Sequence, residues 1–144
     1  MKLVFTNRDL PALTRLLDSL ELAPAPSRAR THLLAALTQH LEIFSKDEYD
    51  LVCLYATLNE DGTPQVSPDG TVTLTDPATA GEFHTEHNTL LAEEMSVELA
   101  DGKAATLLNA LGASSQCFAG DDARALDLLA QSLEQDGQHE GREP

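Results

Sequence analysis

Two arginines, Arg28 and Arg30, stand where the sequence predicts the start of a helix. Ser27 follows two prolines, which are disfavoured inside a helix, and its side chain can cap one, so we expect the helix to begin at about Arg28. The amide dipoles of a first helical turn favour negative charge, and each arginine there costs about 0.3 to 1 kcal/mol. Guanidinium groups beside free helix amides suit phosphate or carboxylate oxygens. This helix start therefore predicts a binding site for an anion.

Three further residues extend this anion site. Arg8 opens the predicted first helix, His32 shares a helix face with Arg28, and an aromatic ring such as Tyr49 could stack on a base. Arg30 continues the apolar stripe of its helix, so we expect its side chain to be half-buried. The candidate ligand-binding residues are therefore Arg8, Arg28, Arg30, His32 and Tyr49. The sequence leaves an alternative open, in which the arginines form ion pairs with the protein's own carboxylates or with those of a second subunit.

Residues that could support metal or covalent chemistry are few. His84 and His87 lie three residues apart on one predicted helical turn, a spacing that can bind zinc, but neither Cys53 nor Cys117 has a supporting motif. The sequence has no nucleophile elbow, no acid–base pair at a diagnostic spacing and no Gly-rich phosphate loop. We therefore expect a protein that is not an enzyme and that uses no metal and no cofactor.

Charge is distributed unevenly along the chain. The net charge of -15 disfavours binding to nucleic acid or to anionic membranes through the overall field. Residues 1–44 carry five basic and four acidic side chains, whereas the remaining hundred carry four basic and twenty acidic side chains. We expect an anionic ligand to meet the N-terminal third and a basic partner to meet the rest.

The elements that must position these residues indicate an α+β fold, mainly helical, with about five to six helices and a small antiparallel sheet or hairpin. The sequence predicts strands at residues 2–6 and 96–100 and a hairpin at residues 65–74. The segment Ser45–Glu48 matches a capping box, so a new helix is expected there. The expected helices cover residues 7–20, 28–44, 46–58, 77–94, 103–111 and 121–135. We expect a single domain over residues 1–135 and a polar tail over residues 136–144.

Three segments follow a pattern that we associate with one family: KLVFTN at residues 2–7, SRART at residues 27–31 and LNEDGTP at residues 58–64. In these segments the chain resembles a family of small phage and prophage proteins of unknown function. It departs from that family in being richer in Ala and Leu and poorer in Lys. The resemblance implies a phage origin, a location in the host cytoplasm and a role in binding.

This resemblance implies functions of different kinds. In the first, a homo-oligomer counters host antiviral defence by sequestering a nucleotide-type immune signal, with Arg28 and Arg30 on its phosphates. In the second, the acidic surface from residue 45 onward acts as a DNA mimic and inhibits a host defence effector, in the manner of an anti-CRISPR protein. A phage accessory or assembly factor is a third. We favour the nucleotide signal over the protein target.

Overall fold

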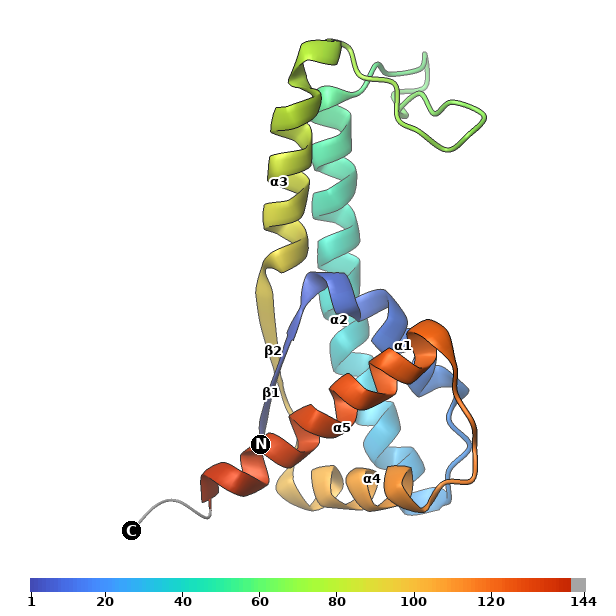
Figure 1. Cartoon of the computed structure of the whole chain (residues 1–144), viewed down its shortest axis with the longest axis vertical. Coiled ribbons are helices and arrows are strands. Elements are labelled where there is room, and N and C mark those ends of the chain that lie inside the picture. The colour runs from blue at the N-terminus through green and yellow to red at the C-terminus, as the bar shows by residue number, and fades with distance from the viewer. Residues whose placement is uncertain (141–144) are drawn as a thin grey trace. The chain divides into compact units, whose positions relative to one another are not determined.

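The computed structural model of the protein describes the backbone of residues 1–140 and the side-chain surroundings of residues 1–134 (Figure 1). The predicted α+β fold, mainly helical with a small antiparallel sheet, is confirmed. The described part contains, in chain order, β1 (Lys2–Thr6), the 3-10 turn η1 (Asn7–Asp9), α1 (Leu10–Ser19), α2 (Pro24–Tyr55), the 3-10 turn η2 (Pro77–Thr79), α3 (Ala80–Ala92), β2 (Glu94–Glu98), α4 (Asp101–Ala113) and α5 (Gly120–Glu140).

The chain divides into two compact units, where the sequence indicated a single domain over residues 1–135. Unit 1 joins Met1–Leu41 to the chain from Glu94 onward, and unit 2 is Glu42–Glu93. Helix α2 contributes to both units, because its residues up to Leu41 belong to unit 1 and the rest to unit 2. Unit 2 is therefore an insertion in the chain of unit 1.

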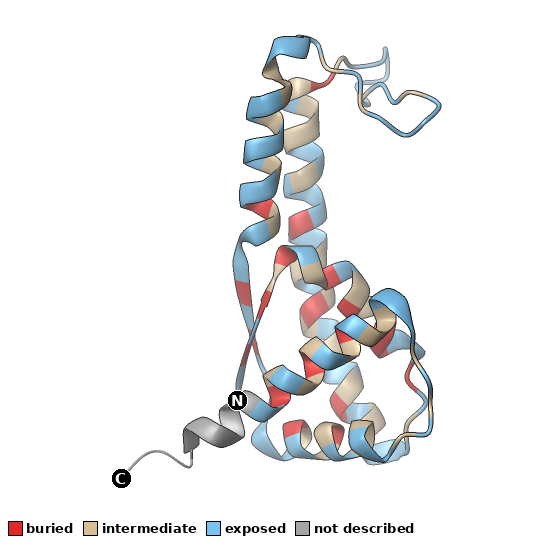
Figure 2. Cartoon of the chain, in the orientation of Figure 1, coloured by how far each residue is buried: buried red, intermediate tan, exposed pale blue. Residues whose placement is uncertain are grey.

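Unit 1 holds the larger core, which is made mostly of leucine (Figure 2). Strands β1 and β2 pair antiparallel, with Leu3 opposite Val97 and Phe5 opposite Met95, and all four side chains are buried. Helix α1 lies within the predicted first helix of residues 7–20 and buries four leucines. Leucines from the other helices complete this core, which includes Leu10, Leu13, Leu16, Leu17, Leu33, Leu37, Leu107 and Leu129.

Helix α2 begins at Pro24, about one turn before the predicted start at Arg28. Proline is tolerated in the first helical turn because the amide that it lacks would have no partner there. The backbone N–H of Ser27 donates to the carbonyl oxygen of Ala23 at 2.9 Å, so Ser27 lies inside the helix instead of capping it. The predicted cap is therefore wrong, and Arg28 and Arg30 lie in the second turn.

The predicted helix break at Ser45–Glu48 is also wrong, because α2 continues to Tyr55. Residues 27–55 contain neither Pro nor Gly, so no residue forces the helix to end. Lys46 Nζ lies 3.0 Å from Asp50 Oδ2, and this ion pair between successive turns supports the helix just where a new one was expected.

Unit 2 consists of the C-terminal part of α2, a looped segment and α3. The predicted hairpin is present as isolated antiparallel bridges, one of which joins Val66 to Val72. The predicted start of the next helix is confirmed, because the Asp76 carboxylate accepts from the Ala78 N–H at 3.0 Å. Aromatic side chains join α2 to α3, with the rings of Tyr55 and Phe83 edge to face at 5.6 Å.

The C-terminal helices of unit 1 follow the sequence-based expectation closely. Helix α4 passes Gly112, the predicted stop, by one residue. Helix α5 begins at Gly120 as expected and continues to Glu140, into the segment predicted to be a polar tail. The rest of that segment, residues 141–144, lies outside the described residues. No helix in residues 1–140 combines the length and the apolar composition that a membrane crossing needs.

Candidate functional site

Arg30 caps the C-terminal end of α1. Its Nη1 donates to the carbonyl oxygens of Leu17 at 2.9 Å and Leu20 at 3.0 Å, and its Nη2 donates to Ser27 Oγ at 3.2 Å. The last carbonyls of a helix have no partner within the helix and carry partial negative charge, so a cation is favourable there. Arg30 is half-buried, as predicted. Its position is explained by α1 itself, without an anion from outside.

The other predicted site residues do not gather around Arg30. Arg28 is exposed, and His32 Nδ1 contacts Lys103 Nζ on α4. Tyr49 belongs to unit 2 and has an exposed side chain. The anion site predicted at the start of α2 is therefore not assembled as expected.

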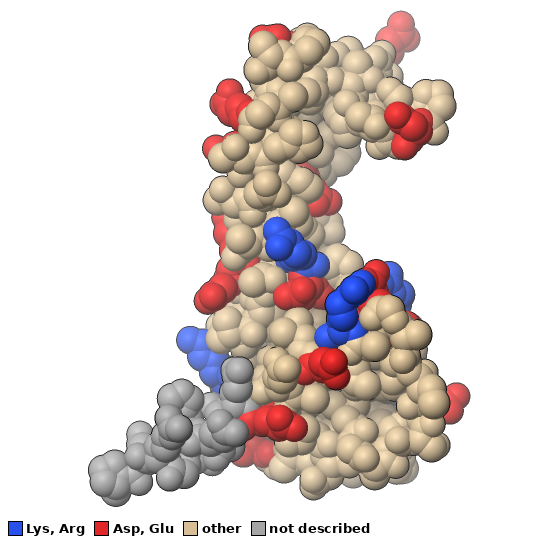
Figure 3. Space-filling view, in the orientation of Figure 1, with Lys and Arg blue, Asp and Glu red and all other residues tan. Residues whose placement is uncertain are grey.

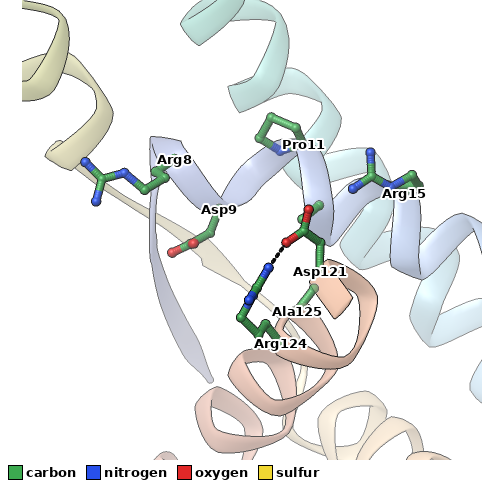
Figure 4. Close-up of a pocket in the computed structure, with 8 residues that line it drawn as sticks. Arg8, Asp9, Pro11, Arg15, Asp121, Arg124 and Ala125 are labelled. Carbon is green, nitrogen blue, oxygen red and sulfur yellow. Dashed lines mark hydrogen bonds and ion pairs between the residues drawn. The ribbon is translucent and has the colours of Figure 1, made fainter. Parts of the chain in front are cut away.

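Arg8 lines a pocket of about 360 Å³ in unit 1, between the N-terminal parts of α1 and α5 (Figure 4). Its lining consists of Arg8, Asp9, Pro11, Ala12, Arg15, Asp121, Arg124 and Ala125. The sequence analysis grouped Arg8, at the start of the first helix, with Arg28 and Arg30 at the start of the second in one anion site. The structure instead brings together the starts of α1 and α5.

The hollow arises from the spacing of long and short side chains on α1. Arg8 lies in η1, directly before α1, and Arg15 follows seven residues later on α1 itself. Between them stand Pro11 and Ala12, whose short side chains leave space, and Ala125 faces them from α5. The opposite side of α1 carries buried leucines, which keep this side toward solvent.

Three aspartates match the three guanidinium groups of the pocket in number, because Asp9 and Asp121 also line it and Asp122 pairs with Arg15. Arg15 Nε lies 3.6 Å from Asp122 Oδ1, and Arg124 Nη2 pairs with Asp121 Oδ1. The hydrogen bond from Arg124 is the main cause that lowers the pKa of the Asp121 carboxyl below its ordinary value. Asp121 therefore stays charged at neutral pH and competes with any anionic ligand for Arg124.

Arg8 makes no ion pair with any described residue, and Figure 4 shows it directed away from Asp121. No hydrogen bond or ion pair within residues 1–134 holds this guanidinium group, so its N–H donors are not committed to another described residue. A guanidinium group has about five N–H donors, and Arg15 and Arg124 commit few of theirs to the aspartates. The pocket therefore offers many donors to an oxyanion.

The arginines of this lining suit the binding of an anion. Its side chains are those of arginine, aspartate, proline and alanine, and none of these is Ser, Cys, His or Tyr. Guanidinium groups stay protonated and do not act as nucleophiles or general bases, whereas the carboxylates of Asp9 and Asp121 belong to a class of group that can do either. Of the two histidines weighed as metal ligands, His87 is paired within unit 2, where its Nε2 lies 2.9 Å from Glu48 Oε2. The described residues hold no cluster of three or more His, Cys, Asp and Glu suited to a metal ion.

A family model described as a protein of unknown function (DUF1617) matches residues 1–140. The chain belongs to this family. No curated protein and no solved structure matches it. The expected membership of a family of unknown function is therefore confirmed. The match spans both units and includes every residue that lines the arginine pocket.

The sequence reasoning missed four charged residues of the pocket in this DUF1617 protein, namely Arg15, Arg124, Asp9 and Asp121. Arg15 could have been found, because it lies on the side of α1 that lacks leucine. Arg124 and Asp121 could not, because they join the pocket only through the packing of α5 on α1, more than a hundred residues away in sequence.

Proposed function

We propose that this protein binds an anionic ligand with phosphate groups in the pocket of Arg8, Arg15 and Arg124, and that binding is its function. One observation carries this proposal. Three of the nine Lys and Arg residues of the chain line the same pocket. Phosphate oxygens match the planar fork of a guanidinium group, which can donate two parallel hydrogen bonds to them. A phosphate-bearing ligand therefore suits this pocket better than a monovalent anion does.

The pocket is large enough for part of a nucleotide. A volume of about 360 Å³ is near the lower end of the range for ligand pockets. The lining contains no aromatic ring that could stack on a base. The phosphates would therefore lie inside, and the base would contact protein beyond the lining, for example in a homo-oligomer.

The biological part of the proposal rests on the resemblance to phage and prophage proteins. It is that the ligand is a nucleotide-type immune signal, which the protein sequesters in the host cytoplasm to counter antiviral defence. This role needs an abundant binder without catalysis, and the chemistry of the pocket lining agrees with that requirement.

The experiment is calorimetric titration of the full chain with inorganic phosphate, mononucleotides and cyclic dinucleotides. Arg15→Gln and Arg124→Gln should each weaken nucleotide binding by about tenfold or more, because each removes a charged donor. Arg28→Gln is the matched control, because it removes the same charge from an exposed residue that does not line the pocket. Failure of every nucleotide to bind, or an equal loss in the control, would contradict the proposal.

A further inference from the structure

Exposed large apolar side chains are concentrated on unit 2. Of the six such residues in the described side chains, five belong to unit 2, namely Ile43, Tyr49, Leu54, Leu58 and Val66. The sixth is Val4 on β1. Ile43 is 60% and Leu54 80% exposed, and their separation of eleven residues is close to three helical turns. These two side chains therefore share one face of α2.

A hollow of about 270 Å³ adjoins this face of α2. Leu51 and Leu90 supply its apolar surface, and Asp47, Glu86 and Glu93 supply three carboxylates. Asp47 lies one turn after Ile43 on the same face of α2, so the hollow and the exposed apolar side chains form a continuous surface. We call Ile43, Asp47, Leu54, Glu86 and Glu93 the docking face.

The charge of unit 2 indicates what this face can meet. Residues 42–93 contain eleven acidic residues and one basic residue, Lys46, whose Nζ lies 3.0 Å from Asp50. Figure 3 shows acidic side chains spread over α3 and the looped segment. Lys46 is hydrogen-bonded to Asp50 and interacts only at longer range with Asp47, so no lysine or arginine of this unit forms an ion pair with the carboxylates of the hollow. Nucleic acids, anionic membranes and a second copy of the same face would all be repelled, whereas a basic partner would be attracted.

We propose that the docking face binds a basic amphipathic segment of another protein and that a Lys or Arg side chain of this segment enters the hollow. The aliphatic stem of such a side chain would lie against Leu51 and Leu90, and its charged end would reach the carboxylates. Apolar side chains beside a charged rim are the usual composition of a protein interface. A mimic of DNA charge needs the acidic residues but gives no role to an exposed Leu54. This proposal goes beyond the anion pocket of unit 1 and does not depend on it.

The test uses a synthetic amphipathic helical peptide of Leu and Lys, titrated into the full chain at physiological salt, with a peptide of Leu and Glu as control. Leu54→Ser and Glu86→Gln should each weaken binding of the Leu–Lys peptide by about threefold to tenfold. Val4→Ser and Asp18→Asn are the matched controls, since both residues are exposed in unit 1. Both should leave the affinity unchanged, as should Arg124→Gln in the pocket of unit 1.

Three results would overturn the proposal. The first is absence of binding of the Leu–Lys peptide to the wild-type chain. The second is equal weakening by Asp18→Asn and Glu86→Gln, which would mean that only net charge matters. The third comes from sedimentation: self-association of the wild type that Leu54→Ser abolishes would show that a second copy covers this face. Loss of nucleotide binding with retained peptide binding would leave this proposal standing and would overturn only the function proposed for the pocket.

Discussion

The Arg30 guanidinium donates a hydrogen bond of 2.9 Å to the backbone carbonyl oxygen of Leu17, which joins the second turn of α2 to the last turn of α1. The same nitrogen reaches the carbonyl oxygen of Leu20 in the connection between the helices. One side chain thus fixes the path of the chain between two helices that both contribute to the leucine core. Arg30 is a structural residue.

Replacement of Arg30 by methionine should lower the free energy of unfolding by about 1 to 2 kcal/mol, because the carbonyl oxygens lose charged donors while the aliphatic stem is kept. We take the lower part of the range for charged hydrogen bonds because Arg30 is only half-buried. Arg28→Met is the control and should change stability by no more than about 0.5 kcal/mol. Urea denaturation measures both, and equal losses would contradict the capping role.

Asp121→Asn should strengthen binding of phosphate and nucleotides to the pocket by about twofold to tenfold, because it releases Arg124 from its ion pair. The pKa of Asp121 is lowered, so this ion pair stabilises the fold above the ordinary carboxyl pKa and is lost as the pH falls through the lowered value. In the wild type, Arg124 loses this ion pair only in acid, when Asp121 is protonated. In the Asp121→Asn variant, Arg124 is without it at neutral pH as well.

The control for this effect is Asp127→Asn, which removes the same charge from an exposed position on α5 outside the pocket lining. Calorimetric titration of the two variants should separate them. Equal strengthening would show that the overall charge of the protein, and not the release of Arg124, governs the affinity.

The phenol of Tyr55 should titrate above its ordinary value of 10.0, mainly because it donates a hydrogen bond of 3.0 Å to Glu82 Oε1. Loss of its proton would place a phenolate beside a carboxylate. Glu82→Gln should therefore lower the pKa of Tyr55 toward 10.0. The pKa of Tyr55 can be measured from the near-ultraviolet absorbance of tyrosinate. The titration is done in a Tyr49→Phe background, because the chain has two tyrosines and the signal must come from Tyr55 alone. Glu60→Gln, a charge loss in the looped segment, should leave the titration unchanged.

Leu129→Ala should lower the free energy of unfolding by about 2 to 5 kcal/mol, because it opens a cavity at a fully buried position in the core of unit 1. Leu54→Ala removes the same atoms from a side chain that is 80% exposed and should cost no more than about 0.5 kcal/mol. Denaturation curves of the two variants compare them directly. A large loss for Leu54→Ala would mean that this side chain is covered and would also count against the docking face.

The parts of the fold that could be predicted from sequence are those fixed by local patterns. The strand at residues 2–6 and the helix that follows it were predicted from neighbouring residues alone, and both are present as β1 and α1. The start of α2 was placed one turn late because proline is acceptable both before a helix and in its first turn. The break at Ser45 was wrong because a serine and a glutamate at capping-box spacing are also tolerated inside a helix.

The candidate site was predictable only in part, because it depends on contacts between distant segments. Arg8 was selected from its place at a helix start, and it does line the pocket. The role of Arg30 was not predicted, because the carbonyl oxygens that it binds become available only where α1 ends beside it. The contribution of Arg124 requires α5 to lie against α1, which no local pattern indicates.

The chain leaves unit 1 after Leu41 and returns to it at Glu94. The residues between them form an insertion, and an insertion can change in length or sequence without a change in the core of unit 1. Related chains could lengthen, shorten or replace this insertion while β1, α1 and α5 keep their sequences. The two binding sites proposed above, one in each unit, would then be free to change independently of each other.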